Sequence, residues 1–174
     1  FKKPEATAEA LDSDGWFHTG DIGEFDNQRF LRITDRKKDI IVTAGGKKVA
    51  PQNLENLLKT VPFISQAMVL GDKRKYIAAL VTLNQETVEG YAKREGIAYR
   101  NFGELAMHPL IRQRIQQAIE EMNKQLASFE SIKRFAILEK DFSQETGELT
   151  PTLKVKRKFV TEKYKDILSG LYSE

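Results

Sequence analysis

A run of apolar residues in the middle of the chain, Ile77-Ala78-Ala79-Leu80-Val81, places the strongest constraint on the fold. A strand with one face in water alternates apolar and polar residues, whereas a strand covered on both faces is apolar throughout. The run therefore predicts a central strand within Tyr76–Leu83. A second β-rich stretch, Phe63–Leu70, precedes it, and the polar segment 71–75 joins the two as a turn.

Helical patterns on both sides of these strands predict that helices cover the sheet. Pro51 stands where a first helical turn accepts proline, Asn84 is suited to cap a helix that ends at Gly96, and Pro109 opens a longer one. We expect apolar residues on the buried faces of the first and third of these helices: Leu54, Leu57, Leu58 and Val61, then Ile111, Ile115, Ile119, Met122 and Leu126. Further expected elements are strands at Ile40–Val42, Lys48–Val49 and Arg134–Leu138 and a final helix at Val155–Leu168, with Val160, Tyr164, Ile167 and Leu171 inward. The pattern predicts an α+β fold, a small mixed or antiparallel sheet covered by helices.

The N-terminal part has a different organisation. After a helical segment near Ala6–Leu11, the strands Ile22–Phe25 and Phe30–Ile33 predict a β-hairpin that is closed by residues 26–29. The following segment, Asp35–Asp39, is charged and carries no large apolar side chain, so we expect it to be a linker.

Composition excludes several classes of function. The 174 residues are 40% hydrophobic, enough for one moderate core, and the net charge of +3 is too small to indicate nucleic-acid binding. The absence of cysteine excludes disulfides, thiolate catalysis and zinc–thiolate sites, and it is consistent with a reducing compartment. No signal peptide is visible and no apolar run approaches the roughly 18 residues of a membrane span. We therefore expect any membrane contact to be peripheral.

Two charged residues at the ends of the expected hairpin are candidates for one binding site. Asp21 directly follows Gly20, where the backbone can turn sharply, and Arg36 lies at the far end of the hairpin. A carboxylate can accept hydrogen bonds from both hydroxyls of a ribose, and a guanidinium donates in a rigid fork. The alternatives are that Asp21 forms an Asx turn and that Arg36 belongs to a solvated basic run with Lys37 and Lys38.

Two basic segments are further candidates. Gly45-Gly46, followed by Lys47 and Lys48, would let an elongated anion approach the backbone closely, although a plain hairpin turn predicts the same glycine pair. Lys154 follows Pro151, which forces Thr150 into an extended conformation, so we expect a stiff, exposed approach to the final helix. The alternative is that Lys154 is one solvated cation of a basic helix start.

Four segments together resemble the adenylate-forming enzymes, and most closely the long-chain acyl-CoA synthetases. They are Gly15-Trp16-Phe17-His18-Thr19-Gly20-Asp21, Asp35-Arg36-Lys37-Lys38-Asp39, Gly45-Gly46-Lys47-Lys48 and Leu149-Thr150-Pro151-Thr152-Leu153-Lys154. Asp35 and Leu153 stand where the commoner form of the family has glycine. Asp35 and the helices between Asn84 and Phe129 favour the long-chain branch.

The resemblance implies a role for each candidate. Asp21 and Arg36 would bind the ribose of ATP and acyl-AMP, Lys38 would be the hinge, and Gly45, Gly46 and Lys47 would line the path of CoA. Lys154 would be the catalytic lysine of adenylation. Trp16 and Phe17 are expected to pack and fix the loop, and His18, for which no partner acid is evident, is expected to be structural. No metal ligands are expected in this chain.

The resemblance also implies a domain organisation and an activity. Residues 1–36 would be the C-terminal edge of an N-terminal adenylation domain, residues 37–39 the hinge, and residues 40–174 a mobile C-terminal domain. The parent enzyme would convert a fatty acid, ATP and CoA into acyl-CoA, AMP and pyrophosphate with Mg²⁺. Its partners would be the N-terminal domain of the same chain and these small molecules, without nucleic acid.

Some alternatives within this interpretation stay open. The chain opens at Phe1 without an initiator Met and lacks the Ser/Thr/Gly-rich ATP loop, so we expect an excised fragment that is inactive alone. The acid could be aryl or branched instead, and a free-standing module that binds CoA or a nucleotide is the alternative from another class. The expected location is the cytoplasm, and the alternative is peripheral contact with the inner face of the membrane.

Overall fold

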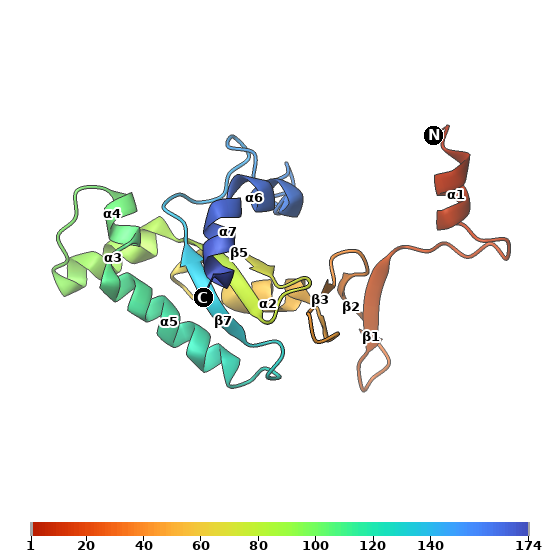
Figure 1. The fold of residues 1–174 in the computed structure, drawn as a ribbon, viewed down its shortest axis with the longest axis horizontal. Helices are drawn as coiled ribbons and strands as arrows, with labels where there is room; N and C mark the ends of the chain where they lie inside the picture. The colour runs from red at the N-terminus through yellow and green to blue at the C-terminus, as the bar shows by residue number, and fades with distance from the viewer. Residues whose placement is uncertain (1, 174) are drawn as a thin grey trace. The chain divides into compact units, whose positions relative to one another are not determined.

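The chain carries its N-terminal hairpin in a separate unit. The computed structural model describes residues 2–173, and it divides into Phe1–Ile40 and Ile41–Glu174, which we describe one at a time (Figure 1). The first unit contains α1 (Pro4–Ala10) and an antiparallel pair, β1 (Asp21–Phe25) and β2 (Leu31–Arg36). Asp26 closes the hairpin by accepting hydrogen bonds from the backbone N–H groups of Gln28 (2.8 Å) and Phe30 (2.9 Å).

The second strand of this hairpin is longer than the sequence predicted. The ladder continues through the pairs Ile22–Asp35 and Asp21–Arg36, so the predicted linker Asp35–Asp39 is wrong at its first two residues. Asp35, opposite Ile22 in this ladder, is buried, at 7% exposure. Only a tight turn follows, in which the N–H of Asp39 donates to the carbonyl of Arg36 (2.9 Å).

A three-stranded sheet forms the centre of the second unit. Its order is β5 (Ile64–Leu70), β6 (Ile77–Leu83), β7 (Ile132–Ile137), with β5 antiparallel and β7 parallel to β6. All seven residues of β6 are buried, which confirms the prediction of a central strand. A small mixed sheet with helices against it confirms the α+β fold class.

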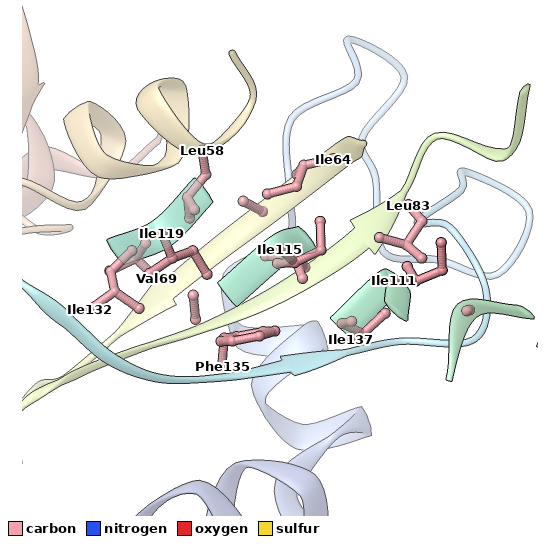
Figure 2. Close-up of a cluster of buried hydrophobic side chains, with 14 of the residues drawn as sticks. Leu58, Ile64, Val69, Leu83, Ile111, Ile115, Ile119, Ile132, Phe135 and Ile137 are labelled. Carbon is pink, nitrogen blue, oxygen red and sulfur yellow. The ribbon is translucent and has the colours of Figure 1, made fainter. Parts of the chain in front are cut away.

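Helices cover both faces of this sheet. One core cluster, drawn in Figure 2, joins Ile77, Ala79 and Val81 of β6 to α2 (Pro51–Leu58), α3 (Gln85–Glu95), α4 (Phe102–Ala106) and α5 (Pro109–Asn123). A second cluster joins Ala78 and Leu80 to α6 (Arg157–Lys163) and α7 (Lys165–Tyr172). The alternation along β6 follows from the period of two in a strand, so one apolar strand serves two cores.

The predicted helix signals are largely present. Asn84 caps α3 by accepting a hydrogen bond from the N–H of Thr87 (3.0 Å), Gly96 ends α3 in the left-handed conformation, and Pro109 is in the first turn of α5. Two details of the predicted buried faces are wrong. Leu57 is 40% exposed, and α5 ends at Asn123, so Leu126 packs on the core from beyond the helix.

The final helix differs from its prediction. Val155–Leu168 was expected to be one helix, but the structure has α6 and α7, separated at Tyr164, whose φ of −110° and ψ of 23° are not helical. The break changes which side chains of α7 face the sheet. Leu168 and Leu171 are buried there, whereas Ile167, which was predicted to face inward, is 41% exposed.

Candidate functional site

The β-hairpin of the first unit brings Asp21 and Arg36 together. They are opposite each other in the β1–β2 register, and Arg36 Nε lies 3.0 Å from Asp21 Oδ1. The loop before Asp21 is held by the Thr19 hydroxyl, which accepts a hydrogen bond from the Asp21 N–H (3.1 Å). A carboxylate has about four acceptor positions, so one bond from Arg36 leaves room for two ribose hydroxyls. The pair thus has the geometry that the sequence argument required.

The alternative readings of this segment can be compared with the structure. Asx turns in this unit are made by Asp12 and Asp26, whereas the carboxylate of Asp21 pairs with Arg36. His18 was predicted to have no partner acid, which is wrong, because its Nε2 lies 3.1 Å from Asp12 Oδ2. This contact falls across the tight turn after α1, where sequence spacing gave no sign of it.

The packing role predicted for Trp16 and Phe17 is not present in this unit. Trp16 is 74% and Phe17 66% exposed. None of the described side chains that form the two buried core clusters comes from the first unit, so residues 2–40 contribute no part of these cores against which the rings could pack.

The glycine pair in the second unit forms a turn between β3 (Ile41–Val42) and β4 (Lys48–Val49). Gly46 has a φ of +73°, which side-chain-bearing residues rarely adopt, and its N–H donates to the carbonyl of Thr43 (2.8 Å). The turn is fixed from outside as well, since the Ala44 N–H donates to the carbonyl of Arg74 (2.9 Å). Lys47 extends over the ring of Phe129, with its Nζ 5.8 Å from the ring centroid. Gly45 and Gly46 are exposed, so their backbone is open to a ligand.

Lys154 lies on a different hairpin of the second unit. Leu149 and Val155 form an isolated antiparallel bridge, and the Thr150 N–H donates to the carbonyl of Lys154 (2.8 Å). The exposed approach predicted from Pro151 includes a tight turn: Pro151 is its second residue, and the Leu153 N–H donates to the Thr150 carbonyl (2.8 Å). The Lys154 side chain is exposed next to this turn.

Leu153 has a left-handed backbone, with a φ of +58°. Such a conformation costs a residue with a Cβ about 1–2 kcal/mol. It stands directly before Lys154, at the position where the resemblance noted glycine in other members. The departure in sequence therefore keeps a backbone shape that glycine adopts more easily.

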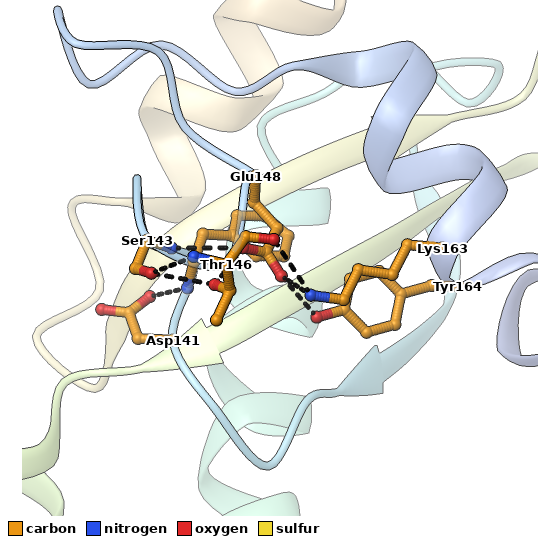
Figure 3. Close-up of polar contacts among 7 residues, drawn as sticks. Asp141, Ser143, Thr146, Glu148, Lys163 and Tyr164 are labelled. Atoms are coloured by element: carbon orange, nitrogen blue, oxygen red, sulfur yellow. Dashed lines mark hydrogen bonds and ion pairs between the residues drawn. The ribbon is translucent and has the colours of Figure 1, made fainter.

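A buried carboxylate lies at the base of this hairpin, and the sequence argument missed it. Glu148 is 1% exposed, and Figure 3 shows Lys163 and Tyr164 converging on it. Its Oε1 accepts hydrogen bonds from Lys163 Nζ (2.5 Å) and the Tyr164 hydroxyl (3.0 Å), and its Oε2 accepts one from the Thr146 hydroxyl. In sequence Glu148 is indistinguishable from exposed Glu145, because both belong to one polar loop.

A second buried carboxylate lies on the other side of the hairpin base. Arg157, in the basic segment that follows Lys154, donates to Glu55 Oε1 of α2 and to the carbonyl of Val69 in β5. Glu55 is 6% exposed and also accepts a hydrogen bond from the Val69 N–H (2.8 Å). The only sequence signal for this pair was a charged residue between Leu54 and Leu58 on the inner face of a helix.

The network around Glu148 predicts how stability depends on pH. Burial by itself raises the pKa of the Glu148 carboxyl, but hydrogen bonds from Lys163, Thr146 and Tyr164 outweigh it and lower the pKa from 4.5 to about 2. The unfolded state then binds the proton more readily, so stability is fully present above pH 4.5 and is lost as the pH falls towards 2. The shift corresponds to at most about 3 kcal/mol.

We expect Glu148→Gln to flatten this acid limb. Urea unfolding of the chain between pH 2.5 and 6 measures it, with Glu145→Gln as the control in the same loop. If wild type and Glu148→Gln lost stability in parallel below pH 4.5, folding would not lower the pKa of the Glu148 carboxyl.

Comparisons with known proteins agree with the resemblance seen in the sequence. Residues 38–174 match the family model described as AMP-binding enzyme C-terminal domain. The chain is 47% identical over 175 residues to the long-chain-fatty-acid–CoA ligase FadD15 of Mycobacterium tuberculosis, covering 100% of this chain and 29% of that protein. It is 41% identical to the rat long-chain-fatty-acid–CoA ligase ACSBG1, covering 98% of this chain and 26% of the relative.

A solved structure with the same fold is the adenylation domain of a carboxylate reductase from Mycobacterium chelonae. It aligns with a TM-score of 0.77 and 31% identity over 100% of this chain and 26% of its own. The chain thus spans less than a third of the length of these relatives. The chain belongs to the family of AMP-binding enzyme C-terminal domains.

Proposed function

We propose that this chain is the C-terminal part of an AMP-forming long-chain-fatty-acid–CoA ligase. The parent enzyme would join a fatty acid to ATP, releasing pyrophosphate, and then transfer the acyl group from the acyl-adenylate to CoA, releasing AMP. The observation that carries the proposal is Lys154, an exposed cation on a short hairpin with a hydrogen-bonded base, in a chain 47% identical to a ligase of this class.

Lys154 suits the first half-reaction. A carboxylate attacking the α-phosphate of ATP brings two anions together, and negative charge builds up on the oxygens between them. A positioned cation offsets that repulsion and stabilises the transition state. The exposed Lys154 Nζ would supply this cation, and Asp21 with Arg36 would hold the ribose of the same nucleotide.

The Gly45–Gly46 turn suits the second half-reaction. Its exposed glycines let an elongated ligand approach the backbone, and Lys47 adds positive charge beside a path for CoA. Lys154 and this turn lie on separate hairpins of the second unit. A change of domain orientation at residues 37–39, around Lys38, would present one hairpin and then the other to the active site.

The surface of the first unit supports a further domain as its partner. Seven large apolar side chains of this unit are exposed. Leu11 is 47% exposed, and six are more than half exposed: Trp16, Phe17, Phe25, Phe30, Leu31 and Ile33. So many exposed large apolar side chains in one small unit are typical of a surface that a partner covers. We propose that the N-terminal adenylation domain of the same protein covers it.

Three finer statements complete the proposal. Mg²⁺ would arrive with ATP, whose phosphates it binds. No helix among residues 2–173 is long and apolar enough to cross a bilayer. We propose a cytoplasmic enzyme, with any membrane contact at the inner face being peripheral.

Pyrophosphate exchange that depends on added fatty acid tests the proposal. A protein that joins this chain to its adenylation domain should exchange labelled pyrophosphate into ATP with a long-chain fatty acid, and form acyl-CoA when CoA is added. The 174-residue chain alone should show no turnover. Exchange with aryl or branched acids alone would instead favour a related carboxylate-activating ligase. Turnover by the chain alone would contradict the proposal that activity requires the N-terminal adenylation domain.

A further inference from the structure

We propose that Glu148 and Glu55 are positioning residues for Lys154. Each fixes one strand of the hairpin that carries Lys154, at the base of that hairpin. The inference rests on the proposed function, because it assigns them a role in adenylation. Neither carboxylate would touch the substrate, since their exposures are 1% and 6%. They would act by determining where the Lys154 backbone lies.

The hairpin cannot fix its own direction. Its backbone hydrogen bonds, from Lys156 N–H to the Glu148 carbonyl (2.7 Å) and from Thr150 N–H to the Lys154 carbonyl (2.8 Å), hold the two strands to each other. Residues 151–154 at its end are all exposed, so no core contact orients them. The direction in which Lys154 projects must therefore be determined at the base.

Glu148 fixes the first strand of the hairpin to the last two helices. Lys163 belongs to α6 and Tyr164 is the residue between α6 and α7, and both donate to the same oxygen, Oε1. The other oxygen accepts from the hydroxyl of Thr146, which also lies within 2.8 Å of the Ser143 hydroxyl (Figure 3). Hydrogen bonds to both carboxylate oxygens leave the side chain one orientation.

Glu55 fixes the opposite side through Arg157, two residues after the Leu149–Val155 bridge. The planar guanidinium donates through Nη1 to Glu55 and through Nη2 to the Val69 carbonyl, so it is held in both direction and rotation. Glu55 is in turn fixed by the Val69 N–H. The hairpin is thereby attached to α2 and to β5 on one side and to α6 and α7 on the other.

Directional hydrogen bonds at the base of the hairpin matter because a small rotation there moves Lys154, at the other end, by a larger distance. A misplacement of about 1 Å in a catalytic group can lower a rate about 100-fold. Apolar contacts would fill the same space without fixing an angle, whereas charge-assisted hydrogen bonds fix both distance and direction. We therefore expect loss of either carboxylate to lower the rate of adenylation while the fold is retained.

The test uses the protein that joins this chain to its adenylation domain. Glu148→Gln and Glu55→Gln are compared with Glu145→Gln, an exposed carboxylate in the same loop as Glu148. We expect kcat for fatty-acid-dependent pyrophosphate exchange to fall about 10–100-fold in the first two, with KM for ATP little changed. Thioester formation from supplied acyl-adenylate should stay near the wild-type rate, and Glu145→Gln should behave as wild type.

A finer variant covers the case in which a buried Gln prevents folding. Tyr164→Phe removes one hydroxyl that donates to Glu148 and keeps the ring beside Phe142. It should fold, lower the rate of adenylation several-fold and leave the thioester step unchanged. An unchanged adenylation rate in Tyr164→Phe and in any Gln variant that folds would overturn the inference, as would an equal fall in both half-reactions.

Lys154→Ala separates this inference from the proposed function. If Lys154→Ala loses adenylation and the carboxylate variants do not, only the positioning role is wrong. If Lys154→Ala retains full adenylation, the proposed function of the hairpin itself is wrong.

Discussion

Lys154→Ala in the parent enzyme is expected to lower the rate of acyl-adenylate formation about 10²–10³-fold, the usual cost of losing one preorganised electrostatic contact in a transition state. Two neighbouring cations of this segment have other partners. Arg157 is engaged by Glu55 and Val69, and Lys156 lies over the ring of Phe159, with its Nζ 5.1 Å from the centroid. Thioester formation from supplied acyl-adenylate should change much less.

The measurement is pyrophosphate exchange beside single-turnover acyl transfer to CoA. Lys158→Ala is the matched control, because Lys158 is an exposed cation of the same basic segment, in α6. A parallel fall in both half-reactions would mean that Lys154 supports the structure and does not act in adenylation.

Lys38→Pro is expected to block acyl-CoA production while pyrophosphate exchange persists. Lys38 stands in the tight turn closed by the bond from Asp39 N–H to the Arg36 carbonyl (2.9 Å). Proline fixes φ near −65° and drives the preceding residue towards extended backbone. Hinges absorb large changes in φ and ψ at a few loop positions, so restricting one should hold the parent in a single arrangement. We expect the adenylating one to survive, since it needs only Lys154 placed against the larger domain.

Lys38→Ala is the control for this variant, because it removes the same side chain and leaves the backbone free. Both variants are compared for acyl-CoA formation and for pyrophosphate exchange, with folding checked by thermal unfolding. Wild-type acyl-CoA turnover by a folded Lys38→Pro enzyme would place the pivot elsewhere.

Local signals in the sequence were sufficient for most elements of the fold. The apolar run in β6 predicted a strand covered on both faces, and Asn84, Gly96 and Pro109 each marked a helix end through backbone chemistry that acts within a few residues. The break at Tyr164 was not predictable in this way. A periodic pattern continues across it, and only the packing of α7 against β7 and the hydrogen bond from Tyr164 to Glu148 show why the helix turns there.

The same distinction between local sequence signals and tertiary packing applies to the candidate site. The sequence by itself determined the family resemblance, the placement of Asp21 and Arg36 at one end of a hairpin, the turn that carries Gly45 and Gly46, and the exposure of Lys154, because each depends on residues close together in the chain or in one ladder. Only the tertiary structure decided which charges are buried. Glu148 and Glu145 look alike in the sequence, and Arg157 looks like its basic neighbours, yet Arg157 meets Glu55 across 102 residues of chain. The energy of a buried charge depends on the partners that the fold brings to it, and local sequence carries no record of them.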